Sequence, residues 1–164
     1  MKRILPLLLC FLLLIGCTPA SENRYVNESF SLDLPTPFEP VSNPSVICFA
    51  PYGDALLSSS VTVYATELNW YFDRFGEDDY AEALKTLCGY DDLTLVGIES
   101  RKIDGCNARR ISCKVQIDQG EHDLILYAIE AERCYFFTLL NREGDSYIDS
   151  FDSMMQTVRF REGA

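Results

Sequence analysis

Histidine and the common catalytic motifs are nearly absent from this sequence. His122 is the only histidine, so a Ser or Cys nucleophile has little choice of a neighbouring general base. The sequence also contains no G-x-S-x-G, no glycine-rich phosphate loop and no H-E-x-x-H. His122 lies beside the Gln119-Gly120 turn, and we expect it to be a solvated surface residue. We therefore interpret the chain as noncatalytic and expect no cofactor.

Basic residues are scarce as well. The chain has 14 Lys and Arg against 25 Asp and Glu, which gives a formal net charge of −11. Such a surface is repelled by phosphate backbones, so we expect no nucleic-acid partner. The acidic runs lack the D-x-D-x-D-G loop of calcium sites, and we expect no metal. Asp145, Asp149 and Asp152 have helical spacing and are expected to form a solvated face.

No apolar run is long enough to cross a membrane as a helix. The longest, Ile4 to Ile15, is interrupted by Pro6 and is shorter than the roughly 20 residues that a hydrocarbon core requires. Lys2 and Arg3 precede it and Gly16 follows it. A basic start, a short apolar segment and a small residue are typical of a secretory signal peptide.

The end of this segment, Leu14-Ile15-Gly16-Cys17, resembles the lipobox of bacterial lipoproteins. The resemblance implies that the thiol of Cys17 receives a diacylglyceryl group and that a peptidase cuts before it. Ordinary signal cleavage after Ala20 is the alternative. We expect a lipid-anchored protein on the extracytoplasmic side of the cell membrane, which contacts the bilayer through the lipid on Cys17.

The predicted organisation has three parts. Residues 1–16 form the signal peptide, 17–23 form the lipidated cysteine and its tether, and 24–164 form a single domain. At up to about 3.5 Å per residue, the tether holds the domain within roughly 20 Å of the lipid.

The cysteines of the domain leave their redox state open. Cys48, Cys88, Cys106, Cys113 and Cys134 are an odd number without C-x-x-C spacing, so at most two disulfides form within a monomer. Because cysteine is also a common buried residue, fully reduced and partly bridged states remain alternatives. Hairpin pairing places Cys113 opposite residues near Val96 and Leu126, and its spacing along one strand excludes a bridge from Cys106 to Cys113.

Period-two alternation predicts most of the secondary structure. Pro35 and Pro37 end the first strand, and Asp104-Gly105 is a strong hairpin signal. A helix follows an N-cap at Asp79, with Gly89 as its C-terminal cap, and a last helix starts at Gly144 and Asp145. The predicted strands are Arg24–Leu34, Val46–Ala50, Ser60–Leu68, Leu93–Ile103, Cys106–Asp118, Glu121–Glu130, Cys134–Asn141 and a terminal strand around Arg159–Arg161.

This element order indicates an α+β protein with an antiparallel sheet of about six to seven strands flanked by helices, an α/β/α sandwich. Two motifs add to it: F-S-L-D-L-P at Phe30 to Pro35, and Phe151-x-x-Met154-x-x-Thr157-x-Arg159-Phe160. The chain thereby resembles the PsbP-like family. The resemblance implies a mostly noncatalytic module: some members stabilise membrane assemblies, one branch binds a small GTPase, and many bacterial relatives are short lipoproteins. No family binding motif matches closely enough to transfer a site.

One connection concentrates aromatic side chains. Trp70, Tyr71, Phe72 and Phe75 lie between a strand and a helix, where they either cover the sheet or form a binding surface. Two functions follow. The first is a lipid-anchored accessory protein that binds a protein partner through these residues. The alternative is a small-ligand or cation-binding lipoprotein with an aromatic and carboxylate-lined pocket.

Replacing Cys17 tests the predicted anchor. The variant Cys17→Ala should lose its lipid and move from the detergent phase to the aqueous phase in detergent phase separation, because the acyl chains supply the membrane affinity. A variant that still partitions into the detergent phase and is cut at the same bond would contradict the lipobox interpretation.

Overall fold

The structure is a computed structural model. It describes residues 23–43, 45–55, 58–67, 77–118, 120–142 and 144–161.

Seven strands form one antiparallel sheet in the order β3-β4-β5-β9-β8-β7-β6. Two runs of sequential hairpins, β3 to β5 and β6 to β9, meet where β5 pairs with β9. The strand bounds are β3 Phe38–Val41, β4 Ile47–Pro51, β5 Ser60–Thr66, β6 Leu93–Ile103, β7 Cys106–Ile117, β8 Gly120–Glu130 and β9 Cys134–Asn141.

A second sheet of three strands joins the two ends of the described chain. In it β2 (Phe30–Asp33) pairs with both β1 (Arg24–Val26) and β10 (Arg159–Phe160). The predicted single strand from Arg24 to Leu34 is wrong because the chain folds back at Asn27. The side-chain oxygen of Asn27 accepts hydrogen bonds from the backbone N–H groups of Ser29 and Phe30, both at 2.8 Å. An Asx turn of this kind competes with a continuing strand.

Strand β3 does not appear in the sequence prediction. It contains Pro40, which cannot donate a ladder hydrogen bond and argues against a central strand. The structure resolves this conflict by placing β3 at the edge of the seven-stranded sheet, where it pairs with β4 alone.

The two predicted turns of the second half have different outcomes. The Asp104-Gly105 turn is confirmed, with Ile103 paired to Cys106 and positive φ at both turn residues. The turn at Gln119-Gly120 is displaced, because Ile117 pairs with Gly120. The pairing therefore shifts by two residues, which leaves every side chain on its predicted face.

The two described helices are α2 (Glu77–Cys88) and α3 (Ile148–Gln156). Asp79 lies inside α2 and is not its N-cap, whereas Gly89 ends α2 as predicted, with a φ of 73° and its N–H bonded to the Lys85 carbonyl. Helix α3 begins at Ile148, later than predicted. Neither described helix has the length and apolar character that a membrane crossing requires.

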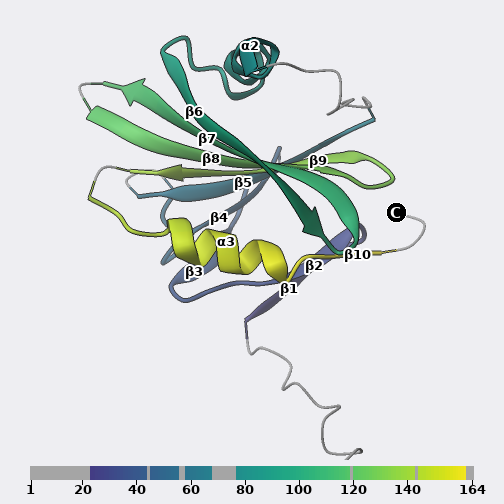
Figure 1. Ribbon diagram of the computed structural model, residues 1–164. Coiled ribbons are helices and arrows are strands. Elements are labelled where there is room, and N and C mark those ends of the chain that lie inside the picture. The colour runs from purple at the N-terminus through teal and green to yellow at the C-terminus, as the bar shows by residue number, and fades with distance from the viewer. Residues whose placement is uncertain are drawn as a thin grey trace, which may run out of the picture.

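The helices lie on opposite faces of the seven-stranded sheet (Figure 1). Helix α2 packs on one face, and α3 packs on the other together with the three-stranded sheet. The α+β class and the antiparallel sheet are confirmed. The described helices are few, and one face of the seven-stranded sheet is covered by α3 together with the three-stranded sheet. The arrangement is therefore only in part the predicted α/β/α sandwich.

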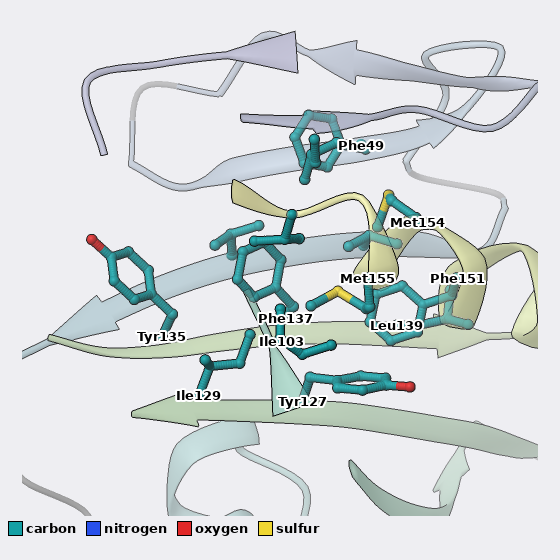
Figure 2. Close-up of a cluster of buried hydrophobic side chains, with 14 of the residues drawn as sticks. Phe49, Ile103, Tyr127, Ile129, Tyr135, Phe137, Leu139, Phe151, Met154 and Met155 are labelled. Atoms are coloured by element: carbon teal, nitrogen blue, oxygen red, sulfur yellow. The ribbon is translucent and has the colours of Figure 1, made fainter. Parts of the chain in front are cut away.

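The larger core lies on the α3 side of the sheet. Phe151, Met154 and Met155 of α3 belong to one buried cluster with the sheet residues Phe137 and Leu139 (Figure 2), and each of the five is at most 2% exposed. These residues recur at helical spacing on α3 and at a spacing of two on β9. The periodicities read from the sequence therefore describe this interface correctly.

An ion pair fixes α3 against the sheet. Asp152 of α3 accepts two hydrogen bonds of 2.9 Å from Nε and Nη2 of Arg110 on β7, and another of 3.0 Å from the hydroxyl of Tyr127. The hydrogen bond to Asp152 raises the pKa of Arg110, so the guanidinium stays charged. Asp145 also accepts a hydrogen bond, at 2.6 Å from the Ser59 hydroxyl. The expected solvated face is therefore wrong for Asp145 and Asp152 and correct for Asp149, which is exposed.

Removing the carboxylate of Asp152 should destabilise the protein. The Arg110 side chain is only 11% exposed, and Asp152 is the closer of its two carboxylate partners, at 2.9 Å against 3.6 Å for Glu99. Asp152→Ala therefore leaves a largely buried charge with its more distant partner alone and should lower the free energy of unfolding by about 2 kcal/mol. Urea denaturation measures this value. Asp149→Ala, on the exposed side of the same helix, is the control and should change it by less than about 0.5 kcal/mol. Equal losses in both variants would contradict the importance of the pair.

Candidate functional site

The predicted site residues lie outside the described part of the chain. This holds for Cys17 and for the aromatic residues Trp70, Tyr71, Phe72 and Phe75. Lipidation of Cys17 and partner binding by the aromatic segment stay predictions.

His122 is not a solvated surface residue. Its exposed fraction is 9%. It lies on the same face of β8 as Leu124 and Leu126, which belong to the core beneath α2. His122 is paired with Val115 of β7, which is also buried. Its strand position, and not its proximity to a turn, decides its burial.

A groove of about 520 Å³ lies beside helix α2 on the sheet face that this helix covers. An α-helix is about 10 Å across and strands lie about 4.8 Å apart, so one helix covers roughly two strands. Side chains of the uncovered β5 and β9 therefore line the groove. The lining residues are Val46, Ser60, Thr62, Tyr64, Thr86, Leu87, Cys88, Tyr90, Leu124, Phe136, Thr138 and Leu140.

The floor of the groove consists of three cross-strand pairs between β5 and β9. The pairs are Ser60 with Leu140, Thr62 with Thr138, and Tyr64 with Phe136. Residues spaced by two along a strand share a face, so the register brings all six side chains to one surface. At about 3.3 Å per residue the floor extends over about 13 Å, with an aromatic end, a central pair of hydroxyls and an aliphatic end.

Aromatic rings stand at two sides of the groove. The rings of Tyr64 and Phe136 are stacked, with centroids 6.4 Å apart and an interplanar angle of 27°. Phe136 is buried, whereas Tyr64 is 55% exposed and presents ring surface to the groove. Tyr90, which follows α2, is half-buried, and desolvation raises the pKa of its hydroxyl. Tyr90 is therefore a neutral hydrogen-bonding group at neutral pH.

Among the described residues, the lining contains no charged side chain. It includes neither Asp, Glu, Lys, Arg nor His. The groove thus shares the aromatic character of the predicted ligand pocket but not the predicted carboxylates. Across the described ranges, no three His, Cys, Asp or Glu side chains gather in an arrangement that could hold a metal ion.

The cysteines of the described residues are free thiols, and two of them lie near the groove. Burial raises the pKa of Cys88, which lines the groove, from 9.0 to about 11, and that of the deeper Cys113 to about 12. The thiolate fraction of Cys88 at neutral pH is therefore about a hundredfold below that of an ordinary thiol. Both side chains are poor nucleophiles. Cys113 pairs with Leu95 and Leu124, close to the predicted neighbours, and no cysteine is opposite it.

Sequence reasoning did not identify the groove, although a signal was present. On β5 the apolar Val61 and Val63 alternate with Thr62 and Tyr64, which predicts one core face and one less covered face. On β9, Thr138 interrupts an otherwise apolar run. Only the pairing of β5 with β9 shows that these polar positions are neighbours.

Comparisons with known proteins identify the fold. No protein-family model matches the sequence, and no curated protein matches it either. The structure is similar to the solution structure of cyanobacterial PsbP (CyanoP) from Synechocystis sp. PCC 6803. The TM-score is 0.64 at 16% sequence identity, covering 89% of this chain and 96% of that one. It is also similar to the crystal structure of a protein from Bacteroides thetaiotaomicron VPI-5482. There the TM-score is 0.56 at 14% identity, covering 88% of this chain and 50% of that one.

These likenesses show the fold alone. The chain has a PsbP-like fold over most of its length, as its element order and motifs predicted. At such low identity the comparison transfers no ligand, partner or activity to this chain.

The thiol state offers a direct test of the structure. Alkylation under denaturing conditions without reductant should modify Cys48, Cys88, Cys106, Cys113 and Cys134, because each is a free thiol. Peptide mass mapping measures the modification at each site. In the folded protein Cys88 should react far more slowly than a small-molecule thiol, because both its burial and its raised pKa suppress the thiolate. A peptide pair joined by a disulfide would contradict this arrangement.

Proposed function

We propose that this protein is an exported, lipid-anchored, noncatalytic binding protein whose ligand site is the groove between α2 and strands β5 and β9. The observation that carries the proposal is the groove itself, which has a volume of about 520 Å³. Sites for small molecules typically measure 300–1,000 Å³ and are lined mainly by apolar and aromatic side chains with a few polar groups. The lining here has this composition.

The position of the groove favours a preformed site. Its floor belongs to β5 and β9, whose seven paired residues hold the backbone in one register. A site on rigid elements keeps its shape without the ligand, so it loses little conformational entropy when the ligand binds.

The export and anchoring part of the proposal is supported by the sequence at Leu14 to Cys17. The noncatalytic part is supported by the groove's chemistry. Within the described ranges its one thiol, Cys88, has a pKa of about 11, and no general base lines it. Contact with a protein partner through Trp70, Tyr71, Phe72 and Phe75 stays a separate prediction.

Filling the groove should abolish ligand binding. We would anchor the full chain in phosphatidylcholine vesicles and use equilibrium dialysis, with empty vesicles as the blank. The probes are 2-naphthol, 2-naphthoate and 2-naphthylmethylammonium, which share one ring system and differ in charge. At least one probe should bind saturably, and Thr62→Phe should weaken that binding at least tenfold, because the new ring occupies the floor.

Thr94→Phe is the matched control. Thr94 is exposed on β6, and its neighbour Leu93 is the residue that faces α2, so the same substitution lies on the other face. It should leave probe binding unchanged, and both variants should keep the melting temperature of the parent within a few degrees. If no probe binds, or if Thr62→Phe binds as well as the parent, the groove is not a ligand site.

A further inference from the structure

The charge of the groove limits what it can hold. The chain carries a net charge of −11, which disfavours an anion near its surface. A cation is attracted from a distance, but no carboxylate of the described residues lines the groove to pair with it once water is displaced. The guanidinium of Arg142, whose charge opposes the desolvation that raises the pKa of Tyr90, donates through Nε to the Ser58 carbonyl at 3.2 Å. A charged ligand would thus lose hydration without gaining a partner.

The hydroxyl groups of the floor are available for hydrogen bonds. Thr86 on the wall donates to the Glu82 carbonyl at 3.2 Å, whereas Thr62 and Thr138 have no side-chain hydrogen-bond partner among the described residues. These two threonines are directly opposite each other, so their hydroxyls are close to the middle of the floor. Each hydroxyl can donate one hydrogen bond and accept others, which suits an uncharged oxygen of a ligand.

The aromatic end of the floor favours a flat ligand. Tyr64 lies over Phe136 in a stacked pair and is more than half exposed. A planar ring can extend this stack, with ring centroids separated by about 4.5–7 Å. Such stacking contributes binding free energy beyond that of the apolar area it buries. The aliphatic side chains of Leu87 and Leu140 then cover the remainder of such a ring.

We propose that the groove takes an uncharged, planar ring compound whose oxygen substituent bonds the hydroxyls of Thr62 and Thr138 while its ring stacks on Tyr64. This inference rests on the proposed function and specifies the chemical class of its ligand. The complex is noncovalent.

The three naphthalene probes test the ligand class in the same vesicle assay. 2-Naphthol is neutral at neutral pH and should bind at least tenfold tighter than 2-naphthoate and 2-naphthylmethylammonium, because only the charged probes lose hydration without a partner. Charged probes that bind as tightly as 2-naphthol, with binding still abolished by Thr62→Phe, would overturn this inference and leave the proposed function intact.

Isosteric variants test the hydroxyl pair. The double variant Thr62→Val, Thr138→Val keeps the shape of the floor and removes both hydroxyls, so it should weaken 2-naphthol about tenfold. 2-Methylnaphthalene, which has the same ring and no hydrogen-bonding group, is the control ligand and should change less than twofold. Equal losses for both ligands would show that the variant damaged the groove, and no loss for 2-naphthol would show that the hydroxyls do not contact it. Either result overturns the proposed role of the hydroxyls.

Tyr64→Leu tests the stack. The substitution keeps an apolar side chain and removes the exposed ring, and it should weaken both neutral probes by a similar factor, roughly three- to tenfold. Unchanged binding of both probes would contradict stacking on Tyr64.

Discussion

The need to cover both faces of a wide sheet governs this structure. Seven strands at about 4.8 Å spacing span about 29 Å between the outermost strand axes, whereas a helix is about 10 Å across. One face meets this requirement with α3 and the three-stranded sheet together. On the other face, α2 lies nearest to β6, and the core beneath it draws most of its sheet residues from β6, β7 and β8. The groove over β5 and β9 follows from this unequal cover, and the side chains at its floor are suited to partial exposure.

The two faces of β5 illustrate how the sequence matches this geometry. Val61 and Val63 point into the core beneath α3 and are at most 5% exposed, while Thr62 and Tyr64 point to the groove. A threonine tolerates a half-covered strand position because its branched side chain packs on the pleat and its hydroxyl remains hydrated. The polar character of the floor therefore stabilises the open face and also offers hydrogen bonds to a ligand.

Local sequence patterns correctly predicted those elements that turn residues or side-chain periodicity determine. Turn chemistry and side-chain period correctly predicted the Asp104-Gly105 hairpin, the strand Leu93–Ile103 and the central residues of β8 and β9. The errors arise where a residue's strand pairing or burial depends on a partner far along the chain. Pro40 lies in a strand because β3 is at an edge, His122 is buried because it shares a face of β8 with residues of the core beneath α2, and Thr62 meets Thr138 only through β5–β9 pairing. No local window contains these relations.

The central strand of the small sheet links the beginning of the domain to its end. Phe30 pairs with Phe160, and Ser60 pairs with Leu140, so two of the joints that close the fold connect residues separated by most of the domain. In a chain that emerges N-terminus first, β2 waits for β10, the last of the described strands, and β5 waits for β9, which follows α2 and three further strands. Such non-local pairing slows folding and leaves apolar strands such as β2 exposed in the meantime. Assembly of the core is therefore a late event in the life of each molecule, completed only when the final strand arrives.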